Sequence, residues 1–499
     1  MYEYGKVQLN PTSFWRSIVQ PGPGRDDPAA REHLGLDLLV ALVSVLLLAV
    51  FAWADPLPND NDALYADVIR AVREGGHLIA LQVNGIPFLD KPPLFFWAGA
   101  LVSKLFGESA FVLRLPAMGA GVLGAVLVAR IARRLTGSRE AGLVAAALLL
   151  SAPTYYEYAR RVYMEVPVAA AGLYAFDLGL RERWKSAGLW AGLAFLCKSV
   201  VGLLGLAGLA VALLCKRRLP AGLWLAAGVA LAVAAPWHVL AYLHGPATFL
   251  DFTVRLHLVD QIASAQPWST GGPLFYPATM AANDTLLCLA LLLALGAAAV
   301  TLRRERPLDL LAVVLAIVLQ LALYTTSATK KPFYLLSMYP FAAVLGAWAL
   351  HRLLRAHPRR QRLAVGLLAA AFAVTCGPLV KPDLAARESS YLRPLAERAR
   401  ELLPPDGQLY TLDVYLAAPQ FYSRRRAVYA VRDARVQQML ARIPYLRYGK
   451  NVVTWRDNLL FGGALVLAPA TQAEALLHRL PGAQVVARNE VCWLVRGPS

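Results

Sequence analysis

Two aspartates, Asp60 and Asp62, follow the first long apolar run of this 499-residue chain, and Tyr65 comes three residues after Asp62. A carboxylate held where a bilayer edge limits water can have a raised pKa and can act as a general base. The same residues also suit a solvated acidic loop, or an N-cap for a helix that begins near Ala63. The spacing alone leaves both interpretations open.

Lys91 comes directly before Pro92-Pro93. The prolines stiffen the backbone and remove its amide donors, which fixes the direction of the lysine. A lysine held in this way suits a phosphate or pyrophosphate group. The alternative is an interfacial lysine that extends toward lipid headgroups.

Further along the chain, Lys198 lies between two short apolar runs, where an ionisable group is costly unless it faces a cavity or a partner. Lys330, Lys331 and Tyr334 follow a later apolar run on the predicted outer side, against the usual bias of basic residues toward the cytoplasm. This exception indicates an anionic ligand.

Arg160, Arg161 and Glu165 begin another span on the same side, and His257 lies in a long outer loop, 244–274. A lone histidine is more often structural than a metal ligand. The charged residues at the start of the span are candidates for the same site.

The elements that position these residues are membrane spans. The chain is 58% hydrophobic and only 16% charged, and a spanning helix needs about 20 apolar residues. Apolar runs lie near 36–53, 110–132, 139–157, 164–181, 187–215, 220–243, 275–301, 308–326, 334–352 and 363–381. The run at 187–215 holds Lys198 near its middle and is better explained as two short spans, so the prediction is about eleven spans.

Lysine and arginine collect in short loops on one side of these spans, which predicts that this side is cytoplasmic. The loop clusters lie at 130–139, 181–185, 216–218, 303–306 and 352–362. The net charge of +18 therefore reports topology. No compact basic domain is present, so nucleic acid is excluded as a partner.

The predicted fold is mainly α: a polytopic membrane protein with a small C-terminal α/β domain. We expect a cytoplasmic tail at 1–35, a transmembrane domain at 36–381 with a catalytic outer loop at 54–109, and an extracytoplasmic domain at 382–499. The first apolar run lacks a small-residue cleavage site and is expected to remain as an anchor. The five cysteines indicate no disulfide framework.

Both predicted outer parts carry recognisable periodicity. In the loop, residues 63–74 repeat apolar side chains at helical spacing, which is typical of an amphipathic helix on a membrane surface. In the C-terminal part, helical periodicity at 393–403 precedes short β-like runs, which predicts a small α/β unit. These runs lie at 408–413, 427–431, 464–469, 483–488 and 491–496.

Taken in order, the motifs resemble the GT-C glycosyltransferases of the protein O-mannosyltransferase and lipid A aminoarabinose transferase superfamily. The resemblance covers most of residues 36–345. Its markers are the acidic pair before Tyr65, the segments 85–94, 105–107, 114–116 and 161–167, the segment 195–198, Pro236-Trp237, and the segment 330–334.

The resemblance implies transfer of a sugar from a polyprenyl-phosphate donor to a lipid A-like glycolipid, a polysaccharide or a protein at the outer face of the membrane. It implies a loop aspartate as the base; the usual Asp-Glu pair is Asn61-Asp62 here, so Asp62 is favoured and Asp60 is second. Glu165 takes the place of a second outer acid, usually aspartate. Inversion at the anomeric carbon is expected.

The resemblance also assigns binding roles. Tyr65, Arg161 and Tyr334 are expected in the substrate site, and the leaving phosphate is expected to be held by Lys91, Lys198, Lys330 or Lys331. Around the later outer loop the family pattern departs, and Arg255 is the substitute for a missing basic residue.

In the lipid A branch, the acid before the lysine and a histidine bind a metal, and Asp90 and His257 match these positions. Two ligands fall short of the four that a closed zinc site needs. A zinc-like divalent ion is thus the only cofactor to consider. No nucleotide is expected, since no Gly-rich phosphate loop is present.

A transporter or flippase of lipid-linked sugars is the alternative function. Such a protein would also use intramembrane lysines and a lipid cavity. It would more often show paired repeats with broken helices in both halves, and neither is clear in this chain.

Overall fold

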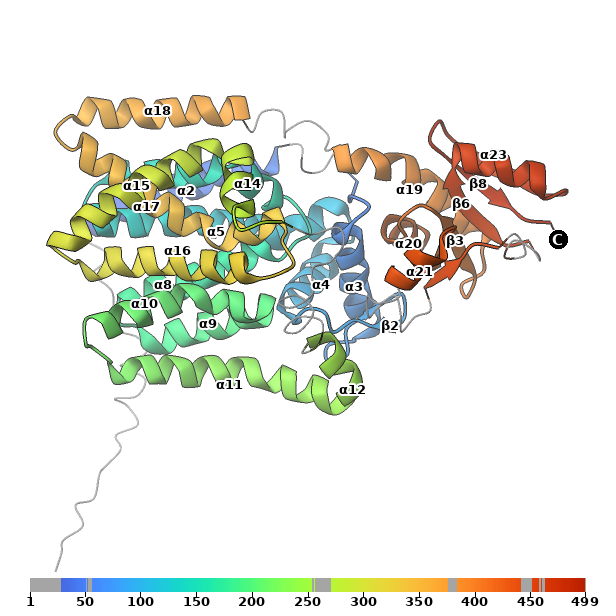
Figure 1. Ribbon diagram of the computed structural model, residues 1–499, viewed down its shortest axis with the longest axis horizontal. Coiled ribbons are helices and arrows are strands. Elements are labelled where there is room, and N and C mark those ends of the chain that lie inside the picture. The colour runs from blue at the N-terminus through green and yellow to red at the C-terminus, as the bar shows by residue number, and fades with distance from the viewer. Residues whose placement is uncertain are drawn as a thin grey trace, which may run out of the picture.

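The computed structural model describes residues 28–50, 52, 56–253, 255, 271–375, 384–440, 451–456, 459 and 463–498. Most of the described chain is helical, and its long helices lie side by side in a bundle (Figure 1). The bundle helices are α2 (Pro28–Ala49), α5 (Ala110–Thr136), α6 (Arg139–Leu150), α8 (Glu165–Leu180), α9 (Trp184–Lys198), α10 (Leu204–Cys215), α11 (Ala221–His244), α15 (Thr285–Arg304), α16 (Leu308–Thr326), α17 (Tyr339–Leu354) and α18 (Pro358–Thr375).

The chain is a multi-pass membrane protein. Within the described residues, five helical stretches are long and apolar enough to cross a bilayer: α5, α11, α15, α16 and the stretch Trp184–Cys215. The other bundle helices correspond to predicted runs but fall short of that length or apolarity. The prediction of about eleven spans therefore stays a prediction.

Several predicted runs are divided in the structure. The run at 187–215 forms α9 and α10, separated by the 3-10 helix η1 (Ser199–Leu203), with Ser199 in the left-handed region at φ 63°. The run at 139–157 is split between α6 and α7 (Pro153–Tyr158), and the run at 275–301 is split between α14 (Phe275–Asn283) and α15. The first break lies directly after Lys198 and frees that residue from the middle of a continuous span.

Small residues allow the bundle helices to approach closely, as is usual in membranes. A Cβ at Gly208 of α10 would lie 2.5 Å from the backbone nitrogen of Ala316 in α16. A Cβ at Gly172 of α8 would lie 2.8 Å from the carbonyl oxygen of Gly202 in η1. The second contact holds the break after Lys198 against the helix that carries Glu165.

The loop between α2 and α5 contains α3 (Asn61–Gly75), the two-stranded ribbon β1 (Gln82–Val83) and β2 (Ile86–Pro87), and α4 (Leu94–Phe106). The predicted helix at 63–74 is confirmed. Its predicted place on a lipid surface is wrong, because Tyr65, Val68, Ile69 and Val72 are buried within the protein. They pack against α4 and against α20 (Ala417–Ser423) of the C-terminal part.

The C-terminal part contains a six-stranded mixed sheet in the order β5-β4-β3-β6-β8-β7. Its strands are β3 (Gln408–Leu412), β4 (Arg426–Val431), β5 (Val452–Thr454), β6 (Leu465–Pro469), β7 (Gln484–Arg488) and β8 (Cys492–Arg496). All five predicted runs are strands, whereas β5 was not predicted. The helices of this part are α19 (Leu384–Leu402), α20, α21 (Ala434–Leu440) and α23 (Ala470–Arg479).

The two ends of the bundle differ. The turns between α10 and α11, α15 and α16, and α17 and α18 lie at one end, while α3, α4 and the C-terminal sheet lie beyond the other (Figure 1). These three turns carry basic clusters that the sequence assigns to the cytoplasm. The acidic loop is therefore at the opposite end from that basic side.

Candidate active site

The N-terminus of α3 carries both aspartates of the acidic pair. Asp60 is the N-cap of this helix, and its side chain accepts a hydrogen bond from the backbone nitrogen of Asp62 at 2.8 Å. The N-cap interpretation of the sequence is confirmed for Asp60. The capping bond uses one carboxylate oxygen of Asp60, and the other oxygen accepts a hydrogen bond from Arg161.

Arg161 joins the acidic residues from across the site. Its Nε donates to Oδ2 of Asp62 at 2.8 Å, one terminal nitrogen donates to Asp60, and the other donates to Oε1 of Glu157 at 3.0 Å. The guanidinium also lies over the rings of Tyr158 and Tyr163, at 5.2 and 5.0 Å from their centroids. Arg161 is thus fixed in position by three carboxylates and two aromatic rings.

The two aspartates differ in access. The side chain of Asp62 has no exposed surface, and its second oxygen accepts a hydrogen bond from the backbone nitrogen of Val162 at 2.7 Å. The side chain of Asp60 is 39% exposed. Burial raises the pKa of Asp62 to about 7, with the charge of Asp60 adding to the rise while Arg161 and Val162 oppose it. Of the two carboxylates, only that of Asp60 faces outward.

A second pair lies where α8 begins and α9 ends. Nζ of Lys198 donates to Oε1 of Glu165 at 2.5 Å, and both side chains are nearly buried. The ammonium also lies 4.8 Å from the centroid of the Tyr334 ring. Oε2 of Glu165 is buried and has no hydrogen-bond partner among the described residues. A buried acceptor without a partner is costly, so this oxygen is suited to receive a donor from a bound molecule.

Lys331 belongs to the same group. Burial lowers the pKa of its amine, and the neighbouring charge of Lys91 lowers it further, while Asp90 and Glu165 act in the opposite direction. Lys91 itself contacts the carboxylate of Asp90 at 2.7 Å. The structure thus brings together Lys91, Lys198 and Lys331, which the sequence selected from three separate segments.

Tyr65 connects the acidic side to the basic side. Its ring is edge-on to Tyr163, with centroids 5.5 Å apart, and Tyr163 in turn contacts Phe333, beside Tyr334. Burial raises the pKa of Tyr65, and the charges of Glu165 and Asp90 raise it further. The phenol therefore lies within the influence of both groups of charges.

Lys330 is placed differently from its neighbour. Its Nζ donates to the carbonyl oxygens of Thr325 and Ser327, each at 2.7 Å, at the C-terminal end of α16. A cation at a helix C-terminus is favourable because it meets the orphan carbonyls and the negative end of the helix dipole. The ammonium of Lys330 is therefore engaged at the end of α16, and its expected contact with a phosphate stays a prediction.

The remaining predicted residues lie elsewhere or outside the described chain. Arg255 is paired with Asp251 at 3.5 Å and its side chain is 65% exposed. His257 lies outside the described residues. Among the residues that the structure describes, no group of three histidine, cysteine or acidic side chains could hold a metal ion, and Asp90 is paired with Lys91.

Two residues that build the site were given no role by sequence reasoning, although Arg114 lies in one of the marker segments. Arg114 donates to the carbonyl oxygens of Ala52 and Pro56, at 2.5 and 3.1 Å, and so fixes the chain just before the acidic pair. Glu157 lies on Arg161. The signal for Arg114 was present, since a buried arginine in an apolar helix needs partners, but its partners are carbonyls that no sequence pattern reveals.

Comparison with known proteins finds sequence relatives over part of the chain. A family model described as dolichyl-phosphate-mannose-protein mannosyltransferase matches residues 90–240. The undecaprenyl phosphate-alpha-4-amino-4-deoxy-L-arabinose arabinosyl transferase of Pseudomonas paraeruginosa is 27% identical over 346 residues, which are 62% of this chain and 60% of that protein. An uncharacterised protein of Aquifex aeolicus is 31% identical over 130 residues, 26% of each chain. The chain thus spans about 60% or less of the length of these curated relatives.

Two solved structures show the same fold over more of the chain. ArnT from Cupriavidus metallidurans, bound to undecaprenyl phosphate, has a TM-score of 0.74 at 18% identity and covers 93% of this chain and 99% of ArnT. The Archaeoglobus fulgidus oligosaccharyltransferase has a TM-score of 0.56 at 15% identity, covering 79% of this chain and 64% of that protein. With the sequence matches, these likenesses confirm the resemblance to the ArnT-like GT-C superfamily.

Proposed function

We propose that this chain, which shares the fold of the ArnT-like GT-C superfamily, is a membrane glycosyltransferase that moves a sugar from a polyprenyl-phosphate donor to an acceptor. The observation that carries the proposal is the juxtaposition at one end of the bundle. There, Arg161, which holds the carboxylates, lies over the ring of Tyr163, and Tyr163 contacts both Tyr65 and Phe333. The ammonium groups of Lys198 and Lys331 lie 5.9 and 5.7 Å from the centroid of the same Phe333 ring. Such a site can bind a phosphate and accept a proton.

In the proposed reaction, an acceptor hydroxyl or amine attacks the anomeric carbon of the sugar. A new bond forms to that carbon as its bond to the phosphate oxygen breaks, and polyprenyl phosphate leaves with the electron pair. Inversion is expected from a single attack opposite the leaving group. Preorganised cations in a water-poor site are effective at stabilising the leaving charge, and Lys91, Lys198 and Lys331 are assigned this role.

Asp60 is proposed to take the proton of the acceptor. Both oxygens of each aspartate accept hydrogen bonds, but the side chain of Asp60 is 39% exposed whereas that of Asp62 has no exposed surface, and this difference supports Asp60. A general base must come within hydrogen-bond reach of the proton that it removes. Asp62 then acts through Arg161 by holding the guanidinium, and with it Asp60, in place.

Glu165 has two proposed tasks. One oxygen orients Lys198, and the other, which has no partner in the described structure, accepts a hydrogen bond from a sugar hydroxyl. Tyr65 and Tyr334 would border the sugar. Asp90 is assigned to orienting Lys91, and no step is derived through a metal, since no three histidine, cysteine or acidic side chains among the described residues are grouped to hold one.

The same proposal includes the orientation. The basic turns support a cytoplasmic location for one end of the bundle and for the N-terminal tail 1–35. The acidic loop 54–109 and the C-terminal part 382–499 would then lie on the outer side of a bacterial inner membrane. The acceptor would be a lipid A-like glycolipid, a polysaccharide or a protein on that side.

Mass spectrometry of lipid A, glycolipids and envelope glycoproteins from deletion and complemented cells tests this function. The proposal predicts the loss of one sugar mass, restored by the wild-type chain but not by Asp60→Asn. A full set of glycans in deletion cells that accumulate lipid-linked sugar on the cytoplasmic side would instead favour a transporter.

A further inference from the structure

The C-terminal part contacts the acidic loop at the residue directly before Asp60. We propose that Asn59 is a positioning residue through which α19 and α20 hold the Asp60–Asp62 pair in its working geometry. This inference rests on the proposed function and extends it, because it makes transfer at the outer end of the bundle depend on a segment some 330 residues away in sequence.

Asn59 makes contacts with two C-terminal helices at once. Its Nδ2 donates to Oε1 of Glu388 in α19 at 3.0 Å, and its Oδ1 accepts from the backbone nitrogen of Ala418 in α20 at 2.9 Å. Two residues earlier, the backbone nitrogen of Leu57 donates to the hydroxyl of Tyr422 in α20 at 2.9 Å. Asn59 is 8% exposed and its bond with Ala418 is buried, whereas the bond with Glu388 is only partly buried because Glu388 is exposed.

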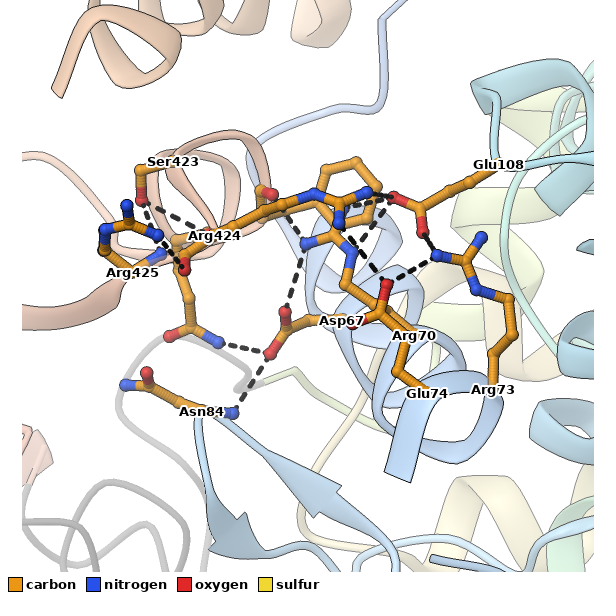
Figure 2. Close-up of polar contacts among 11 residues, drawn as sticks. Asp67, Arg70, Arg73, Glu74, Asn84, Glu108, Ser423, Arg424 and Arg425 are labelled. Carbon is orange, nitrogen blue, oxygen red and sulfur yellow. Dashed lines mark hydrogen bonds and ion pairs between the residues drawn. The ribbon is translucent and has the colours of Figure 1, made fainter. Parts of the chain in front are cut away.

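The rest of α3 is held against α20 by charged groups. Figure 2 shows Asp67 and Arg70, one helical turn apart, directed toward the end of α20. Oδ2 of Asp67 accepts from Nε2 of Gln420 at 2.7 Å, and Nη1 of Arg70 donates to the carbonyl oxygen of Phe421 at 2.7 Å. These contacts fix the register of the two helices, and Asn59 fixes the end at which the aspartates lie.

The position of Asn59 explains why it should affect rate more than binding. Asn59 directly precedes Asp60 in the chain. The lysines assigned to the donor phosphate, Lys91, Lys198 and Lys331, come from other segments. A misplacement of about 1 Å in a reacting group can cost about 100-fold in rate. Loss of the Asn59 contacts should therefore lower kcat and leave the KM for the donor nearly unchanged.

The first test replaces and then rebuilds the contact with Glu388. Asn59→Ala should lower kcat about tenfold with the donor KM within about twofold. Asn59→Asp should lower kcat as much, because it sets a carboxylate against Glu388. The double variant Asn59→Asp/Glu388→Gln keeps the net charge and supplies the amide donor from residue 388. It should therefore recover most of the rate. Glu401→Gln is the matched control, since Glu401 lies on α19 in an exposed pair with Arg398, and it should behave as wild type.

A second readout does not depend on catalysis. Amide hydrogen exchange of residues 57–64 should be faster in Asn59→Ala and should return to the wild-type rate in the double variant. Unchanged exchange in Asn59→Ala, an unchanged kcat, or a double variant no better than Asn59→Asp would each overturn the inference. If the wild-type chain transfers no sugar, the proposed function fails, and the exchange result alone decides whether Asn59 holds the acidic pair.

Discussion

Arg161 is the residue on which the acidic side of the site depends, because one side chain contacts Asp60, Asp62 and Glu157. Asp62 has no exposed surface and loses its charge partner if Arg161 is removed. Removing one member of a buried ion pair typically costs about 3–5 kcal/mol, since the remaining charge stays buried and unpaired.

Arg161→Ala is therefore expected to lower the free energy of unfolding by about 3–5 kcal/mol and to abolish transfer. Adding Asp62→Asn should restore part of the stability, because the unpaired buried charge is then gone, but no activity. Thermal unfolding in detergent, together with a transfer assay, checks both. A single variant that unfolds at the wild-type temperature would contradict the role given to this pair.

The raised pKa of Asp62 predicts a pH dependence near neutrality. Because burial raises that pKa to about 7, Asp62 becomes protonated as the pH falls below 7. Arg161 then shares its charge between Asp60 and Glu157 and makes Asp60 a weaker base. Transfer should rise with pH through about 7, and Asp62→Asn should lack this limb and show low, flat activity. A wild-type rate that is constant from pH 6 to 8 would contradict the argument.

The sign for stability is the opposite. A carboxyl whose folded pKa lies above its unfolded value makes the folded state lose stability as the pH rises from the unfolded value of 3.8 to about 7. Ionisation of Asp62 therefore lowers the stability of the folded state. Asp62→Asn should weaken this part of the dependence of unfolding on pH.

The neighbouring lysines Lys330 and Lys331 provide a matched pair. Lys331→Met should weaken donor binding by about tenfold or more, as expected for loss of a charged hydrogen bond, with little change in stability. Lys330→Met should instead lower stability by about 1–3 kcal/mol, because two carbonyls at the end of α16 lose their donor. Donor-binding and unfolding measurements on both variants separate the roles. The reverse pattern would exchange the two assignments.

At this scale, the sequence predicted most of the participants but not their arrangement. Asp62 and Arg161 were both selected, yet their hydrogen bond joins residues 99 positions apart. Nothing in the spacing indicates that Asp62 would have both oxygens occupied, or that Lys330 would turn to carbonyls while Lys331 faces the site. The contacts of Asp62 are tertiary, and those of Lys330 are local bonds that form only because α16 ends just before it.

Helix α3 is held by α20 and by the turn between α4 and α5. Glu108, in the turn between α4 and α5, accepts hydrogen bonds from Arg70 and pairs with Arg73 at 2.7 Å and Arg424 at 3.4 Å (Figure 2). Burial alone would raise the pKa of Glu108, but Arg70, Arg73 and Arg424 outweigh burial and hold it below the usual range. The carboxylate therefore stabilises the fold in its charged form.

Glu108→Gln should lower the free energy of unfolding by about 3–5 kcal/mol, because three arginines lose their common partner. The sign follows from the lowered pKa: the contribution of Glu108 is present above its unfolded value of 4.5 and is lost as the pH falls through the lower folded value. Unfolding of wild type and variant across acidic pH checks this. Equal stability of the two at neutral pH would contradict it.

The sequence predicted which segments form helices or strands, because apolar runs and alternating patterns indicate them. It did not predict where a helix breaks within an apolar run. The division of the predicted span 275–301 comes at Asp284, whose carboxylate accepts hydrogen bonds from Thr154 and Tyr339 at 2.7 and 2.6 Å. A polar residue in an apolar run can end a helix when such partners exist, and the partners lie in distant segments. Strand β5 was missed because three residues are too few for a period to be recognised.

The whole molecule separates its charges along the bundle. Three basic turns lie at one end, and α3, α4 and the C-terminal sheet lie beyond the other (Figure 1). The predicted mainly helical architecture is confirmed, and its fold is shared with ArnT. The sequence matches support the GT-C resemblance beside that fold. The sequence could not predict that the C-terminal part packs on α3, since the buried face of α3 is equally compatible with a lipid surface.

The most direct test of the proposed transfer uses the full chain in vesicles with an isotopically labelled polyprenyl-phosphate sugar and outer-side acceptors. The account predicts release of free polyprenyl phosphate and a covalently labelled acceptor with wild type, and neither product with Asp60→Asn despite normal donor binding. Movement of intact donor across the bilayer, with no cleavage of the sugar–phosphate bond, would contradict it.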